Sequence, residues 1–278
     1  MVSNSTLKDL LNEYDKKQIK ANTELESRKA ALYKKIPRLA EIESELNSVA
    51  ISSAKAILST NATDILKDLQ SKVDVLKSER LELLKKEGKT LDYLSPTFEC
   101  AKCKDTGYVL DGEKTVMCSC LKQKILDIEY NNSNIGNLDR ENFKKFNINL
   151  YSDEVNEEKY NSDLSPRDNI KVIGKEAKKF IKNFDDPLQK NLLFSGGTGL
   201  GKTFLSNCIV AELLAQGKTV LYQTAPVMFD TLINEIFNKN SDNSFSKNLL
   251  NVDLLVIDDL GTETMNSMKF TELYKIIN

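Results

Sequence analysis

The sequence predicts a multidomain protein: an all-α N-terminal region, a small cysteine-rich module and an α/β core with a parallel sheet. Three observations predict this order. The first third of the chain has helix-type apolar spacing and no glycine before Gly88. Two close pairs of cysteines follow within a short segment. Strand-like and helix-like segments then alternate around a glycine-rich loop. We expect four parts, at residues 1–95, 96–127, 128–165 and 166–278.

Composition excludes several classes of protein before any motif is considered. The 278 residues carry a formal net charge of −2, so the chain as a whole has no general attraction for nucleic acid. Histidine is absent, which leaves carboxylates, lysines, metal and water to carry any acid–base chemistry. The start of the chain does not resemble a signal peptide, and no apolar run approaches transmembrane length. Five cysteines without an export signal indicate a cytoplasmic protein in a reducing compartment, with no membrane contact.

The region 1–95 is predicted to be helical and coiled-coil-like. Apolar residues recur at spacings of three and four in three runs, within residues 7–14, 25–49 and 66–83. Pro37 is expected to kink or restart the second run, because proline cannot donate a helical hydrogen bond. Residues 61–64 resemble a turn, so the last two runs can pair as an antiparallel hairpin. A hairpin of this kind suits the docking of a protein partner, and a helical spacer is the alternative.

Residues 96–127 are predicted to form a zinc-binding module. Two cysteine pairs, separated by an insert of fourteen residues, comprise Cys100, Cys103, Cys118 and Cys120. Four thiolates satisfy tetrahedral Zn²⁺, and turn residues around positions 108–110 predict a short hairpin between the pairs. Because so short a segment cannot bury a sizeable core, metal ligation would supply its folding energy. Protein ligands fill all four positions, which makes the expected zinc structural. Four reduced thiols in a loop are the alternative.

Residues 128–165 are predicted to connect this module to the core. Three aromatic residues, Phe143, Phe146 and Tyr151, stand among charged residues. We expect them to pack the connector onto the next domain rather than to contact a base. Ser165 and Pro166 then form a helix start, because serine caps a helix and proline favours its first position. This helix is expected to run towards residue 184.

The core is organised around a glycine-rich phosphate-binding loop, the P-loop, which follows a strand predicted over residues 192–195. The loop fits the pattern G-x-x-x-x-G-K-[ST]. Its glycines let N–H groups point at phosphate oxygens, while Lys202 supplies a positive charge and the Thr203 hydroxyl ligates Mg²⁺. A helix over residues 202–215 would turn its positive end towards the phosphates. A nucleoside triphosphate is therefore expected to contact Gly196, Gly197, Thr198, Gly199, Leu200, Gly201, Lys202, Thr203, Phe204 and Asp258.

Strands and helices alternate after this loop. Residues 219–223 and 254–258 are predicted strands, and residues 227–238 and 270–277 are predicted helices. Asp258 ends the second strand at its carboxyl edge, where ligands bind in parallel sheets. We expect Asp258 to hold Mg²⁺ through water, in the Walker B role, while Asp259 orients or deprotonates the attacking water and Lys202 assists catalysis. Cys208 is expected to be a buried apolar residue of the loop helix.

These motifs resemble those of the bacterial replicative-helicase loaders of DnaC/DnaI type, which are AAA+ ATPases. The resemblance is dense from residue 100 onward, and its motifs are Cys100-x-x-Cys103, Cys118-Ser-Cys120, Glu141-Asn-Phe143, Ser165-Pro-Arg167, the P-loop and Asp258-Asp259-Leu-Gly261. It implies an ATPase that delivers the ring-shaped replicative helicase onto single-stranded DNA. It also implies that the N-terminal region contacts the helicase, that the core binds ATP and single strands, and that ATP-dependent self-association is open to the chain.

Two alternatives belong to other classes. A transposition helper ATPase of IstB type shares nearly the same core, but proteins of that type typically lack the cysteine module. A zinc adaptor that binds nucleotide without hydrolysing it is the third interpretation. At position 259 this chain has aspartate where AAA+ proteins most often have glutamate, and a shorter base suits a slow switch better than a fast motor.

The resemblance also leads us to expect an incomplete core. AAA+ sheets resemble one another in the strand order 5-1-4-3-2, and this sequence supplies candidates for the first three strands only. The family's sensor-1 strand, arginine finger and sensor-2 region would follow residue 278. We therefore expect a truncated loader with weak ATP binding and slow hydrolysis, because arginine fingers supply a large share of the rate in such enzymes.

Overall fold

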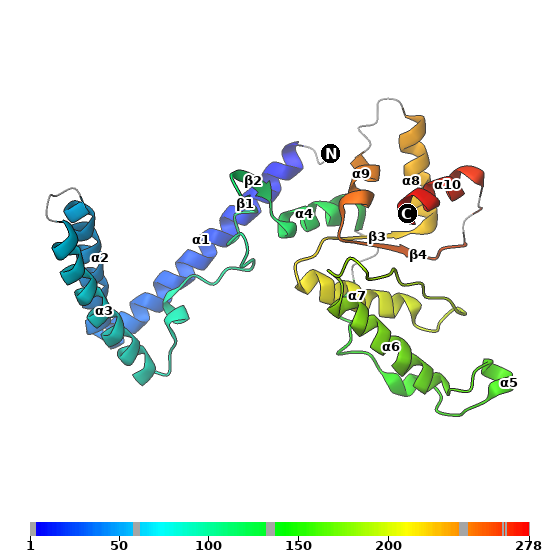
Figure 1. Cartoon of the computed structure of the whole chain (residues 1–278), viewed down its shortest axis with the longest axis horizontal. Coiled ribbons are helices and arrows are strands. Elements are labelled where there is room, and N and C mark those ends of the chain that lie inside the picture. Colours follow the sequence, from blue (N-terminus) through cyan, green and yellow to red (C-terminus); the bar gives the residue numbers. More distant parts are fainter. Residues whose placement is uncertain are drawn as a thin grey trace. The chain divides into compact units, whose positions relative to one another are not determined.

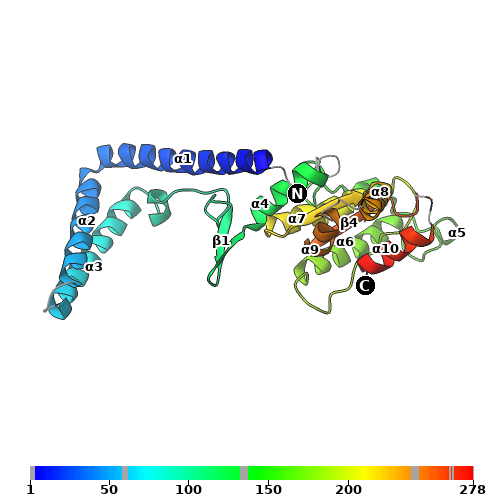
Figure 2. The same cartoon turned by 90° about the horizontal axis from the view of Figure 1, so that it is seen from above.

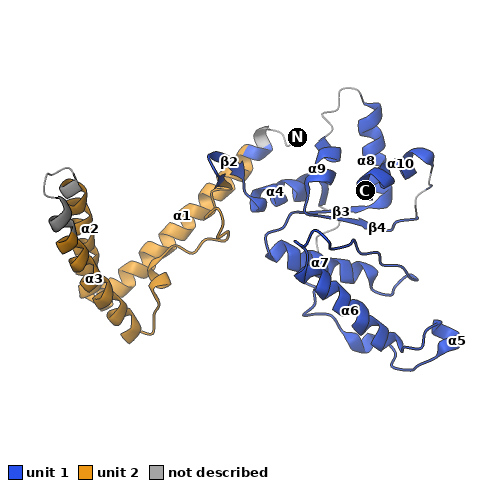
Figure 3. Ribbon diagram, viewed as in Figure 1, with its two compact units in different colours: residues 1–7, 110–278 blue, residues 8–109 orange. Residues whose placement is uncertain are grey.

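The computed structural model describes residues 4–57, 62–131, 137–238, 244–262, 264 and 266–277 (Figure 1). The chain divides into two compact units (Figure 3). One comprises residues 8–109, and the other comprises residues 1–7 together with residues 110–278. The division falls inside a short hairpin strand. None of the described helices is both long enough and apolar enough to cross a bilayer.

Three helices make up most of the first unit, as the apolar spacing predicts. They are α1 (Asn4–Lys35), α2 (Pro37–Ile57) and α3 (Ala62–Lys86). Ile36 separates α1 from α2, and Pro37, which has no N–H to donate, opens α2 at the position that the sequence marks for a restart. A short 3₁₀ turn, η1 (Leu91–Leu94), follows α3.

Helices α2 and α3 lie side by side as a hairpin (Figures 1 and 2). Arg38 on α2 binds Glu79 on α3 through two hydrogen bonds of 2.7 and 2.9 Å, and it also reaches Glu45 at 2.7 Å. Leu39 of α2 and Leu84 of α3 are fully buried in one apolar cluster. The predicted pairing is thereby confirmed. The turn predicted at residues 61–64 is wrong for residues 62–64, which begin α3, and residue 61 lies outside the described residues.

The segment after η1 contains the expected short hairpin. It consists of β1 (Tyr108–Asp111) and β2 (Lys114–Met117), with Gly112 in the left-handed region at φ 59°. Cys118 occupies the N-cap position of α4 (Ser119–Leu126). A π-helical turn, η2 (Asp127–Asn131), follows this helix directly. Two small elements of the connector follow, η3 (Ile148–Leu150) and α5 (Glu157–Tyr160).

The α/β core contains the helices and strands that alternate in the sequence. They are α6 (Pro166–Lys182), α7 (Lys202–Ala215), β3 (Val220–Thr224), α8 (Ala225–Phe237), α9 (Ser244–Asn251), β4 (Leu254–Asp258) and α10 (Ser267–Ile277). Ser165 caps α6 by accepting a hydrogen bond from the Asp168 N–H, which confirms the predicted helix start. Helix α9 was not predicted from the sequence.

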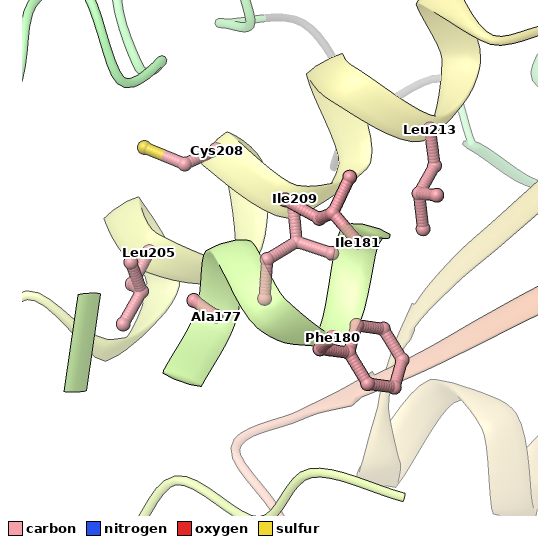
Figure 4. Packing of buried hydrophobic residues seen from close by; sticks show 7 residues of the cluster. All are labelled: Ala177, Phe180, Ile181, Leu205, Cys208, Ile209 and Leu213. Atoms are coloured by element: carbon pink, nitrogen blue, oxygen red, sulfur yellow. The ribbon is translucent and has the colours of Figure 1, made fainter. Parts of the chain in front are cut away.

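Strands β3 and β4 pair in parallel, with Val220 opposite Leu254 and Thr224 opposite Asp258. Helix α7 packs on the face that carries Val220 and Tyr222, and α6 covers α7 (Figure 4). Helix α8 lies against Leu221 on the opposite face. Cys208 is fully buried between α6 and α7, as predicted, and burial raises the pKa of its thiol to about 11.

The prediction of a strand over residues 192–195 is wrong. The segment forms no regular secondary structure, and Leu193 is 82% exposed. A strand needs a hydrogen-bonded neighbour. In the part of the chain that the structure describes, β3 and β4 pair with each other, and neither pairs with this segment.

Candidate nucleotide and metal sites

The glycine-rich loop leads directly into α7. Gly199 and Gly201 have φ of 76° and 89°, a region that residues with a side chain rarely adopt, and Gly201 is the N-cap of the helix. Helix α7 begins at Lys202, so its N-terminal N–H groups lie at the loop. A helix N-terminus favours anions because unpaired N–H groups and the helix dipole act together.

Lys202 lies folded onto its own loop. Its Nζ donates hydrogen bonds to the carbonyl oxygens of Gly196 (3.0 Å) and Gly197 (2.9 Å). The loop from residue 195 to residue 200 is exposed, so a phosphate has access to the same ammonium group. Lysine suits this task as a compact point charge on a flexible stem.

Thr203 and Asp258 meet across the loop. The Thr203 hydroxyl donates to Asp258 Oδ2 at 3.0 Å, although the residues are 55 apart in sequence. The contact forms because Thr203 occupies the first turn of α7 and Asp258 the carboxyl end of β4. Hydroxyl and carboxylate oxygens are the ligands that Mg²⁺ prefers, so the chemistry of this donor set fits the predicted ion.

A third side chain, which belongs to none of the sequence motifs, reaches the same carboxylate. The Tyr222 hydroxyl donates to Asp258 Oδ2 at 2.7 Å. Tyr222 lies in β3 and is 2% exposed. Burial and the neighbouring carboxylate raise the pKa of this phenol, which keeps it a hydrogen-bond donor. The only sequence signal for this contact is a tyrosine that follows two apolar residues in β3.

Asp259 is the next residue in the chain, and it lies at the surface. It is exposed and adopts the left-handed conformation at φ 55°. Its N–H donates to Asp258 Oδ1 at 3.0 Å, and its carbonyl accepts from the Thr262 hydroxyl at 2.8 Å. A non-glycine residue held at positive φ is often part of a functional site. The next acid along the chain, Glu263, lies outside the described residues.

The connector also contacts the P-loop, through Tyr151. The Tyr151 hydroxyl donates to the Leu200 carbonyl at 3.0 Å, and a Cβ at position 201 would lie only 2.7 Å from that hydroxyl. Phe146 stacks on Tyr151 and also meets Phe204 in the first turn of α7. The predicted packing of the connector aromatics onto the core is therefore confirmed, and it gives Gly201 a second reason to lack a side chain.

The four cysteines of the second predicted site also come together. The Sγ atoms of Cys100, Cys103, Cys118 and Cys120 all lie within 4.8 Å of one another, and none of the five cysteines forms a disulfide. Cys103 and Cys118 are buried. Such a set of four thiols fits a tetrahedral metal site, with Zn²⁺ the ion that this chemistry favours.

Backbone hydrogen bonds hold the first cysteine pair in a tight turn. Asp105 is 2% exposed, and its carboxylate accepts from the N–H groups of Glu99 (2.9 Å) and Cys100 (2.8 Å). The Lys104 N–H donates to the Cys100 carbonyl at 2.8 Å. Asp105 thus orients the backbone that carries the thiols, as partners of metal ligands commonly do.

The fold and the loop define the class of the core, a P-loop nucleotide-binding domain of α/β type. More particularly, residues 156–278 match the family model of the IstB-like ATP binding protein. This part of the chain is therefore similar to IstB-like ATP-binding proteins.

Curated relatives support the resemblance to loaders of DnaC type. The replicative helicase loader DnaC of Escherichia coli (strain K12) is 32% identical over 104 residues, which are 37% of this chain and 42% of the relative. DnaC of Buchnera aphidicola subsp. Baizongia pistaciae is 34% identical over 90 residues, 31% of this chain and 36% of the relative. The chromosomal replication initiator protein DnaA of Helicobacter pylori is 36% identical over 84 residues, 30% of this chain and 18% of the relative. The chain thus spans less than half the length of the relatives that it matches.

Proposed function

We propose that this chain is a helicase loader that binds ATP, hydrolyses it slowly and delivers the replicative helicase onto single-stranded DNA. The observation that carries the proposal is the meeting of Thr203 and Asp258 beside the P-loop, within a domain of IstB-like type. Similarity to the DnaC helicase loaders supports the choice of the replicative helicase as partner.

In this proposal, different site residues bind the phosphates, hold the metal ion and activate the water. Lys202 and the N–H groups at the start of α7 bind the phosphates, because both present positive charge to the same loop. Thr203 and Asp258 would hold Mg²⁺, which neutralises charge on the phosphates when bound. Asp259 orients or deprotonates the attacking water. Its short side chain, held at positive φ, suits slow turnover.

The metal and the helical hairpin take supporting roles. Cys100, Cys103, Cys118 and Cys120 would hold one structural Zn²⁺, which leaves no ligand position open for substrate. The helices of residues 1–95 form the docking surface for the helicase. A long, charged hairpin that contributes no residue to the nucleotide site suits the docking of a partner.

A transposition helper of IstB type is the second candidate, and the matching family model favours it. The cysteine cluster favours the loader, because the resemblance places that module in loaders. Partner choice separates the two: a loader binds the replicative helicase of its cell, and a transposition helper binds a transposase.

Binding of the helicase tests this proposal. The full chain should bind immobilised replicative helicase, whereas a variant that begins at residue 96 should lose that binding. ATP affinity of the shortened variant serves as the control for a folded core and should stay close to that of the full chain. Equal helicase binding by both proteins would remove the docking role of residues 1–95. Absence of binding by the full chain would favour the transposition helper.

A further inference from the structure

Three groups converge on the carboxylate of Asp258. Its Oδ2 accepts from the Thr203 hydroxyl at 3.0 Å and from the Tyr222 hydroxyl at 2.7 Å, and its Oδ1 accepts from the Asp259 N–H at 3.0 Å. The nucleotide site accounts for Thr203 as a neighbour of the phosphates. It does not account for the phenol of Tyr222, which reaches Asp258 from the neighbouring strand β3.

The register of the sheet explains how Tyr222 reaches this point. Thr224 is the cross-strand partner of Asp258, and Tyr222 lies two residues earlier on β3, opposite Val256. Side chains two apart on a strand share a face, so the phenol ring points along the face that bears Asp258. The ring is packed in the cluster with Val210 and Val220, which leaves its hydroxyl at the edge of the site.

The backbone of Tyr222 is held by side-chain amides at the outer edge of β3. Asn131 Oδ1 accepts from the Tyr222 N–H at 2.9 Å, and Asn131 Nδ2 donates to the Val220 carbonyl at 2.9 Å. Gln123 Oε1 accepts from the Val220 N–H at 2.6 Å, and its Nε2 donates to the same carbonyl at 3.0 Å. These two amides take the place of a neighbouring strand, so β3 and its phenol have a fixed position.

We propose that Tyr222 is a positioning residue whose hydroxyl holds the Asp258 carboxylate in the orientation that Thr203 and Mg²⁺ require. The proposal rests on the proposed Mg–nucleotide site. Without the phenol, Oδ2 keeps the Thr203 hydroxyl and Oδ1 keeps the Asp259 N–H, so the carboxylate loses one of the three hydrogen bonds that fix its orientation. Partners behind a metal ligand commonly change metal affinity when they are removed, even though they do not touch the ion.

The variant Tyr222→Phe tests this role because it removes the hydroxyl and keeps the buried ring. Binding of a fluorescent ADP analogue to the full chain is measured across Mg²⁺ concentrations and in EDTA. We expect the Mg²⁺ concentration for half-maximal effect to rise about tenfold, while affinity in EDTA stays unchanged. In an Asp258→Asn background, Tyr222→Phe should add no further change.

The matched control is Tyr130→Phe. Tyr130 lies in the same unit, its ring is tilted against that of Phe245 with the centroids 5.0 Å apart, and its hydroxyl is hydrogen-bonded to Ser244 and Asn248. This control should keep the Mg²⁺ dependence of the unmodified chain. If Tyr222→Phe does not fold, as judged by circular dichroism, Tyr222→Met, a smaller and more flexible apolar side chain without a donor, is expected to give the same shift.

Two results would overturn the inference. One is an unchanged Mg²⁺ requirement in the folded variants. The other is an equal loss of affinity with and without Mg²⁺, because that indicates general damage to the loop. Failure of the unmodified chain to bind the analogue in a Mg²⁺-dependent way would instead count against the proposed nucleotide site itself.

Discussion

At the scale of single residues, Lys202 and Asp259 have separable tasks. Lys202 touches the loop that receives the phosphates, whereas Asp259 lies at the end of β4 and is exposed. We predict that Lys202→Ala abolishes productive ATP binding, because it removes the phosphate-facing charge. Asp259→Asn should bind ATP normally and stop hydrolysis, because an amide cannot accept the proton. Equilibrium binding and steady-state turnover check both statements, and normal turnover by Asp259→Asn would reassign the base.

The residues of the P-loop could be predicted because their chemistry is local. Gly196 to Thr203 form one continuous motif, and each residue type has a defined task there. Tyr222 could not be predicted, because its contact with Asp258 spans 36 residues and depends on strand register. The same holds for the Tyr151 hydroxyl on Leu200, which spans 49 residues.

At the scale of elements, the cysteine hairpin provides a sharp prediction. We expect purified protein to contain about one Zn²⁺ per chain, because four thiols fill a tetrahedral site. Cys103→Ser should lower the metal content and unfold the segment locally, since small zinc modules depend on the ion for their fold. Metal analysis and limited proteolysis measure the two effects. Cys208→Ala, which changes a cysteine buried in α7 outside the cluster, should keep the metal.

A metal-free protein whose hairpin resists the protease as well as metal-loaded protein would contradict a structural zinc. That result would favour four reduced thiols, held by the turn around Asp105. In that turn the carboxylate already fixes two backbone N–H groups.

Elements with strong local patterns were predictable, and elements that depend on partners were not. Helix α7 and strand β4 have the predicted bounds, because the loop motif and the apolar run before Asp258 define them. Residues 192–195 have the composition of a strand, but a strand forms only beside a neighbour. Helix α9 is short and polar at its start, and its position depends on Phe245 and Leu249 packing against α8.

At the scale of the whole molecule, the order of parts follows from composition. A glycine-poor helical region, a cysteine hairpin and an α/β core appear along the chain as expected. The division into two compact units inside β1 was not predictable, because it depends on contacts between distant residues.

The central claim is that ATP binding at the P-loop drives delivery of the replicative helicase onto DNA. The most direct measurement is unwinding by that helicase on circular single-stranded DNA with an annealed strand, where a closed ring cannot thread onto an end. The account predicts that unwinding requires this chain and ATP, and that Lys202→Ala fails to support it despite normal helicase binding. Equal unwinding with the unmodified chain, with Lys202→Ala or with no added chain would contradict the claim.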